Sequence, residues 1–266
     1  MAFDDDGFLS PDLVAWTATI RTEFKDWFEL VESFNRDAMK VLWSIKPSLS
    51  KNQQLVAALL YGRALQSFQG TVLMAERGMI ADALTLVRSC AATAIAIGGV
   101  AVDEKFVDDL IEAHDSHHLS YANVILNDPE SLRELTPEQI DNLQQVIAQV
   151  TGKYKAPRPR RIKWDRAAKK AKMSALYDTI YRMTSGDAVH TTVLALDRHI
   201  QPDDHRTIGH LTFRPESRDP VQTLSMAANA LLHAMEAMAR IFPEEGFERT
   251  GKSYMDRWQK TMHPLQ

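Results

Sequence analysis

Apolar residues recur along this chain at the three- and four-residue intervals that are typical of helices with one buried face. Only 11 glycines and 11 prolines interrupt the 266 residues, so the helical segments between them are long. One patch, residues 203–219 (DDHRTIGHLTFRPESRD), breaks the helical pattern. The pattern predicts an all-α protein: a single irregular helical bundle of about eight to ten helices over residues 1–266, with at most one short extended pair.

Capping residues and glycines predict where the helices begin and end. Thr136, Pro137 and Gln139 have the spacing of a capping box with proline in the first turn. Gly78 and the pair Gly98–Gly99 predict the ends of two other helices. The expected helices, of which the first can be a helix pair, cover approximately residues 11–45, 51–77, 81–97, 103–126, 137–151, 173–184, 188–200, 220–242 and 252–262.

Composition narrows the class of protein. With 45% hydrophobic residues the chain can bury a substantial core, and its single cysteine, Cys90, excludes an internal disulfide and is typical of a reducing compartment. The start, MAFDDDGFLS, is acidic where a secretory signal is basic. The longest apolar run, residues 89–102, is too short to span a bilayer core of about 30 Å. We therefore expect a cytoplasmic protein without a membrane partner, in which this run is a buried helix.

Several polar residues fall on apolar stripes when the helices are drawn at 100° per residue. Arg63, Arg88 and His114 each lie on such a stripe, and Tyr177 and Tyr181 share the apolar face of their helix. Neither arginine has an acidic residue three or four positions away. Because a buried guanidinium without a partner costs several kcal/mol, something must satisfy both. Two interpretations remain open: a structural network with distant acids and the tyrosines, or an anion-binding pocket inside the bundle.

The segment after the tyrosines offers a candidate base. Ser185 and Gly186 are expected to end one helix and Asp187 to cap the next, which puts His190 at its third position. The positive helix end there favours the neutral imidazole, so His190 is a weak catalytic candidate. Arg182 lies opposite the apolar stripe with Asp178 four residues before it, and we expect a surface ion pair.

Metal and cofactor motifs are weak or absent. The stretch EAHDSHH places His114 and His118 four residues apart, and a loop carries His205 and His210, but neither set has a completing second ligand group. No phosphate-binding loop, dinucleotide glycine pattern or serine-nucleophile elbow is present in the sequence. We expect no metal and no cofactor.

A basic segment offers the one local case for nucleic acid, although the net charge is -4. Residues 153–172 contain ten basic residues and one acid, Asp165. The part over 153–163 contains two prolines and is predicted to be a linker within the domain. Phosphate contacts and base stacking on RNA are the alternative. The candidate RNA contacts are Arg158, Arg160, Arg161, Lys163 and Trp164.

Two stretches, YGRALQSFQGTVLMAERGMIADALTLVRSC (61–90) and LYDTIYRMTSGDAVH (176–190), carry a family resemblance. In order and spacing the chain resembles, over roughly residues 55–190, an uncharacterised bacterial all-helical family, a domain of unknown function. The family often has a glutamate one turn after the second arginine, where this chain has Ala92, so the resemblance supplies no carboxylate partner for Arg88. It implies the following ligand-binding positions: Arg63, Arg88, Tyr177, Tyr181, Ser185 and His190. His114 joins them from its place on an apolar stripe.

More distantly the chain is similar to HEPN helical domains, many of which are RNases that carry an R-x4-6-H motif and act as dimers. Arg182 and His190 have seven residues between them, and Arg206 and His210 have three, so neither pair has this spacing. We expect a helical protein that binds an anionic, nucleotide-like small molecule, with a role in bacterial stress or phage defence. The alternatives are a metal-independent RNase toxin of HEPN type and a non-catalytic scaffold. A homodimer is also among the expected assemblies.

Overall fold

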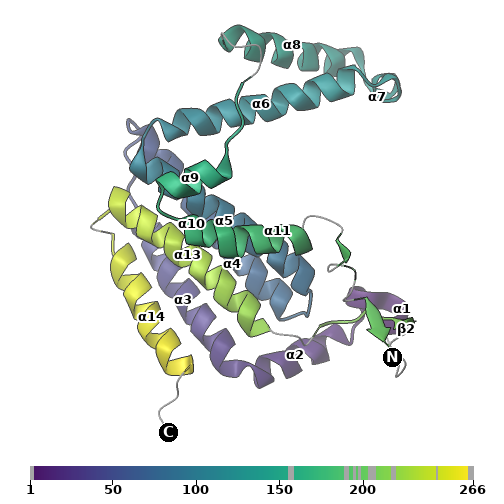
Figure 1. Ribbon diagram of the computed structural model, residues 1–266, viewed down its shortest axis with the longest axis vertical. Helices are drawn as coiled ribbons and strands as arrows, with labels where there is room; N and C mark the ends of the chain where they lie inside the picture. The colour runs from purple at the N-terminus through teal and green to yellow at the C-terminus, as the bar shows by residue number, and fades with distance from the viewer. Residues whose placement is uncertain are drawn as a thin grey trace. The chain divides into compact units, whose positions relative to one another are not determined.

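The structure, a computed structural model, describes residues 3–154, 159–188, 192–193, 196, 199–202, 208–216, 220–243 and 245–262. Four residues singled out in the sequence, Arg158, His190, His205 and Arg206, lie outside these ranges. The described residues are overwhelmingly helical, which confirms the predicted all-α class (Figure 1). The chain divides into two compact units, whereas the sequence predicts one domain over residues 1–266. Unit 1 comprises residues 1–102 and 164–266, and unit 2 comprises Asp103–Lys163.

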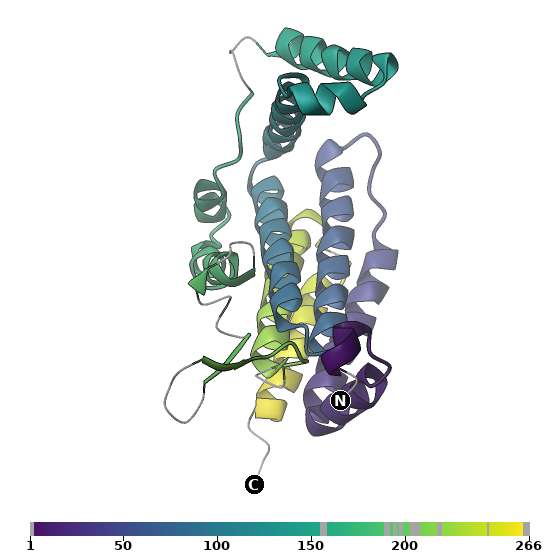
Figure 2. The same cartoon turned by 90° about the vertical axis from the view of Figure 1, so that its right-hand side faces the viewer.

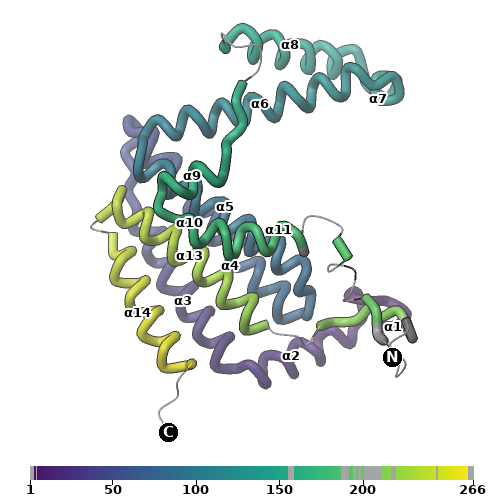
Figure 3. The backbone as a smooth tube through the Cα atoms, viewed as in Figure 1, coloured from purple at the N-terminus to yellow at the C-terminus, as the bar shows by residue number. Residues whose placement is uncertain are grey.

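Three long helices, α4 (Asn52–Ala75), α5 (Ile80–Val102) and α13 (Pro220–Ile241), pack against one another at the centre of unit 1. Two more, α3 (Lys25–Ser44) and α14 (Phe247–Met262), pack together and flank this core (Figure 3). By length and composition α5 alone among the described helices could cross a membrane, but 61% of its apolar window is buried. The sequence prediction of a buried helix is confirmed, because most of the residues of α5 are buried and the helix packs against both α4 and α13.

The predicted end of this helix at Gly98–Gly99 is wrong, because α5 continues to Val102. Gly98 has a packing role instead of a capping role. A Cβ atom at Gly98 would lie 2.8 Å from the Cβ of Ala171 and 2.9 Å from the Sδ of Met173. The chain after α9 (Trp164–Lys170) therefore approaches the α5 backbone closely because residue 98 has no side chain.

We expect Gly98→Ala to lower the free energy of unfolding by about 1 to 2 kcal/mol, because overpacking outweighs the gain in helix propensity. Gly62→Ala on α4 is the matched control, since a Cβ there meets nothing within 4 Å. That variant should raise the free energy of unfolding by about 0.5 to 1 kcal/mol. Urea denaturation followed by circular dichroism measures both, and equal stabilisation by the two substitutions would contradict the close packing at Gly98.

The stretch that carries the tyrosines is one continuous helical segment. It consists of α10 (Ser174–Leu176), a π-helical turn η2 (Tyr177–Tyr181) and α11 (Arg182–Ala188). The predicted break at Ser185–Gly186 is therefore wrong. A Cβ at Gly186 would meet open space, and the Ser185 hydroxyl donates back to the Tyr181 carbonyl oxygen at 2.5 Å, so neither residue interrupts the helix.

The remaining described elements of unit 1 are the first helices of the chain and a pair of short strands. They begin with α1 (Phe3–Asp6), a 3-10 turn η1 (Gly7–Leu9) and α2 (Leu13–Glu23). Strands β1 (Ile200–Pro202) and β2 (Ile208–Leu211) pair antiparallel, as the predicted short extended pair requires. The chain after β2 lies beside the N-terminal helices (Figure 2), where the rings of Phe8 and Phe213 meet edge to face at 5.5 Å.

Unit 2 is a helical hairpin. Helices α6 (Phe106–Leu126) and α8 (Pro137–Lys153) pack against each other, and the short α7 (Pro129–Glu134) lies between them in the chain. The predicted capping box is confirmed, because the Gln139 backbone N–H donates to Thr136 Oγ1 at 3.3 Å and the Thr136 N–H donates to Gln139 Oε1 at 2.8 Å. This reciprocal pair determines where α8 begins.

Candidate functional site

A half-buried arginine from α5 meets two hydroxyl groups from the tyrosine segment. Arg88 Nε donates to Ser185 Oγ at 2.7 Å, and Arg88 Nη2 donates to Tyr181 Oη at 3.0 Å. The residues are 93 and 97 positions apart in sequence, and they meet because α11 and η2 pack on α5. We call Arg88, Tyr177, Tyr181 and Ser185 the Arg88 cluster.

Aromatic rings surround the guanidinium on one side. Arg88 Cζ lies 4.5 Å from the centroid of the Tyr181 ring, within the range of a cation–π interaction. The Tyr177 ring stacks on Tyr181 at 5.1 Å and 18°, and the Trp164 ring lies 6.5 Å from Tyr181. Residues 177 and 181 are four positions apart and lie on one side of the helix. They are the two ends of a π-helical turn, and such turns are frequent at functional sites.

The charge of Arg88 has no carboxylate partner among the residues that the structure describes. Its two hydrogen-bond acceptors are neutral hydroxyl oxygens, and Nη1 makes no hydrogen bond to a described residue. All four members of the cluster are half-buried, so the cluster lies at the surface of unit 1 and not in an enclosed pocket inside the bundle. Such an arrangement leaves both Nη1 and the Tyr181 O–H able to donate to an anion.

Arg63 does not join this cluster, and its predicted inward orientation is wrong. The side chain is exposed on α4 and donates to Gln66 Oε1 at 3.0 Å. The buried line of α4 passes through Tyr61, Leu65 and Phe68 instead. Because α4 is apolar on much of its circumference, sequence periodicity alone did not identify the side that packs against α5 and α13.

His114 is also exposed, so its predicted inward orientation is wrong, and it belongs to unit 2 whereas Arg88 belongs to unit 1. Its ring lies 4.0 Å from that of His118, one helical turn later. The buried Ser116 and Leu119 lie on another side of the helix, whereas the first turn of the predicted stripe, with Phe106 and Val107, is buried. His190, the candidate base, lies outside the described residues.

The described residues do not support a metal site or a cysteine nucleophile. No group of three or more potential metal ligands occurs there, and the side chains of His205 and His210 are not among those described. Cys90 is fully buried and donates to the Ala64 carbonyl oxygen at 3.5 Å. Burial raises the pKa of this thiol to about 12, which opposes formation of a nucleophilic thiolate.

Some of the positive charges of the basic segment are paired with acidic residues of unit 2. Arg160 makes a bidentate pair with Glu112, with Nη2 to Oε2 at 3.0 Å, and Lys153 Nζ lies 2.7 Å from Asp115 Oδ2. Hydrogen bonds from Arg160 lower the pKa of Glu112. The pair therefore contributes fully to the stability of the hairpin at pH values above the ordinary carboxyl pKa. This contribution is lost as the pH falls through the lowered pKa. Burial alone would raise the pKa of Asp115, but hydrogen bonds from Lys153 and Tyr154 lower it.

The other RNA candidates are distributed differently. Arg161 and Lys163 are exposed, whereas Arg158 lies outside the described residues. Trp164 begins α9 in unit 1 and contacts Tyr181 of the Arg88 cluster. Arg182 is exposed and lies 3.4 Å from Asp178, which confirms the predicted surface pair.

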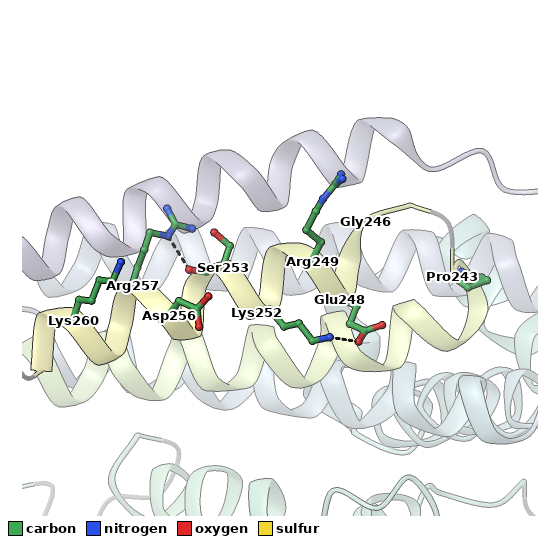
Figure 4. A pocket seen from close by; sticks show the side chains of 9 residues that line it. All are labelled: Pro243, Gly246, Glu248, Arg249, Lys252, Ser253, Asp256, Arg257 and Lys260. Carbon is green, nitrogen blue, oxygen red and sulfur yellow. Dashed lines mark hydrogen bonds and ion pairs between the residues drawn. The ribbon is translucent and has the colours of Figure 1, made fainter.

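A groove of about 740 Å³ along α14 was missed by sequence reasoning, which began this helix at residue 252 instead of Phe247 (Figure 4). Two of its cations are already paired: Lys252 with Glu248 at 2.6 Å and Arg257 with Asp37 at 3.1 Å. The strong amphipathic pattern of residues 247–262 is the signal that could have located it. The lining residues are Pro243, Gly246, Glu248, Arg249, Lys252, Ser253, Asp256, Arg257 and Lys260.

Comparison with known proteins assigns the chain to a family without a known activity. A family model described as a family of unknown function, DUF5677, matches residues 54–207, which is more than half of the 266 residues. No curated protein and no solved structure matches the chain. The matched range contains Arg88, Tyr181 and Ser185, together with the whole of unit 2. The chain therefore belongs to this family of unknown function.

Proposed function

We propose that the protein binds an anionic, nucleotide-like small molecule at the Arg88 cluster. One observation carries the proposal: a half-buried guanidinium is held by two neutral hydroxyls and has no carboxylate partner among the described residues. Partial burial reduces solvation of the positive charge, which makes a bound anion more favourable there than at an exposed arginine.

The donors that remain suit a phosphate or carboxylate. Ser185 and Tyr181 hold Nε and Nη2 of Arg88, which orients the guanidinium and leaves Nη1 without a described partner. Because the Tyr181 oxygen accepts from Arg88, its own O–H can donate to the same anion. The rings of Tyr177 and Trp164 next to this donor pair supply apolar faces on which a base could stack.

The proposed setting is the cytoplasm of a bacterium, in stress or phage defence. The single cysteine supports a reducing compartment. The role in stress or defence rests on the family resemblance alone.

The test is the thermal stability of the purified protein with ATP, GTP or pyrophosphate. A ligand that binds only the native state raises the apparent stability, by about 2.7 kcal/mol at a hundredfold excess over its Kd. We expect at least one of these anions to raise the Tm of the wild type and of Arg63→Ala, an exposed arginine of the same unit, but not of Arg88→Ala. No shift with any of the three, or equal shifts in both variants, would contradict the proposal.

An RNase of HEPN type and a non-catalytic scaffold are the alternatives. If the protein is an RNase, the purified protein should cleave RNA. The substitution His190→Ala should then abolish this cleavage and any growth defect on expression. The scaffold alternative requires neither cleavage nor an anion-dependent Tm.

A further inference from the structure

Unit 2 contains far more apolar surface than its own hairpin buries. The large apolar side chains buried in its helices are Phe106, Val107, Leu119 and Val150. Others are only half-buried: Leu110, Ile125, Leu126, Ile140, Leu143, Val146 and Ile147. Ile111, Tyr121 and Val124 are exposed. A two-helix hairpin cannot enclose a core, and helices with such stripes are normally completed by further helices in a bundle.

The uncovered residues of α6 form a seam with coiled-coil spacing. Ile111, His114, His118, Tyr121 and Ile125 follow one another at intervals of three, four, three and four residues. We call these five residues the α6 seam. Its first four members are exposed and Ile125 is half-buried. At 100° per residue, Tyr121 lies 200° from the buried Leu119, so the seam is on a different side of α6 from Ser116 and Leu119. The buried Val107 lies on the line of the seam, one turn before its first member, Ile111.

The charge pattern of α6 favours self-association in one orientation. Asp108 and Asp109 lie in the first turn, whereas residues 116–127 contain no acidic or basic residue apart from His117 and His118. The acids in between, Glu112 and Asp115, are already paired with Arg160 and Lys153. In an antiparallel pair of α6 helices, the acidic first turn of each copy faces the uncharged end of the other, whereas a parallel pair would place like charges together.

We propose that the α6 seam is a homodimer interface, in which α6 of one copy packs antiparallel against α6 of a second copy and the two hairpins complete a four-helix bundle. Such an interface is isologous, because the same seam is used by both copies. This inference is independent of the Arg88 cluster, since it concerns a different unit and a different chemistry.

The size of the seam predicts the strength of the dimer. Helix α6 has 21 residues, so at about 1.5 Å per residue and a width of about 10 Å it covers about 300 Å² per copy. Stable complexes bury about 800 Å² per partner, so we expect a weak dimer with a Kd in the micromolar range.

Sedimentation velocity of the full chain between about 1 and 200 µM tests the proposal, a range that brackets the expected Kd. The wild type should change from monomer to dimer over this range. Tyr121→Glu places a charge in each copy of the seam and should raise the dimer Kd by at least about tenfold, whereas Tyr121→Phe should leave it unchanged. Leu59→Glu is the matched control, because Leu59 is 67% exposed on α4 of unit 1 and Tyr121 is 60% exposed.

Two results would overturn the interface. The first is a wild type that stays monomeric over the whole range; if its Tm then falls in Tyr121→Glu but not in Leu59→Glu, the seam packs within its own chain. The second is an equal loss of dimer in Leu59→Glu.

Discussion

Arg88→Ala is expected to weaken, by about a hundredfold, the binding of the nucleotide or pyrophosphate that shifts the Tm; at about 1.4 kcal/mol per tenfold change this is about 2.8 kcal/mol. The reason is that the substitution removes the only formal charge of the cluster, the Nη1 donor, and the Nη2 group that holds the Tyr181 hydroxyl in place. Charge-assisted hydrogen bonds to a phosphate are among the strongest that a protein makes, which supports an effect of this size. Isothermal titration calorimetry measures the change in Kd.

Two controls separate a ligand site from a structural network. Tyr181→Phe keeps the ring over Arg88 and removes only the hydroxyl, so we expect a smaller loss of affinity, about tenfold or less. Without ligand, Arg88→Ala should cost no more than about 1 to 3 kcal/mol, because the residue is half-buried and its partners are neutral. If the variant instead loses stability without any change in Kd, the cluster is structural and the binding proposal is wrong.

Phe34→Ala on α3 is expected to cause the largest loss of stability, about 3 to 5 kcal/mol. The side chain is fully buried, its ring stacks on Tyr254 of α14 at 4.2 Å, and it meets Phe68 of α4 edge to face at 5.8 Å. Removing it leaves a cavity where three helices are held together. Urea denaturation of the full chain, with circular dichroism as the signal, measures the loss.

Trp43→Ala is the control for this prediction because Trp43 lies on the same helix and is 78% exposed. That substitution should change the free energy of unfolding by no more than about 0.5 kcal/mol. Equal effects of the two substitutions would show that α3 does not pack through Phe34. Both substitutions replace an aromatic residue of the same helix by alanine, so the difference between their effects on the free energy of unfolding measures the burial of Phe34.

Local features of the sequence predicted much of the secondary structure. The capping box at Thr136 and Gln139 forms as expected, and Gly78 ends its helical segment with a positive φ of 69°. Both depend on residues within a few positions of each other, so no knowledge of the rest of the fold is needed. The Arg182–Asp178 pair was predictable for the same reason, because i,i+4 neighbours meet on any helix.

Long-range packing decided the features that periodicity could not. Gly98 interrupts no helix because Ala171, more than 70 positions later, packs against it. Arg63 and Arg88 look alike on helical wheels, yet Arg63 is exposed while Arg88 meets Tyr181 and Ser185. Periodicity identifies a stripe but does not say which neighbouring element covers it, and on α6 the stripe is buried at Phe106 and Val107 but exposed at His114 and Tyr121.

The sequence by itself therefore determined the helical class, most helix limits and the short-range caps and pairs, since these depend on backbone propensity and contacts within one or two turns. Only the tertiary structure decided the division into two units and the composition of the Arg88 cluster. These depend on which helix faces pack together, and that choice is made by the summed burial of side chains from distant parts of the chain.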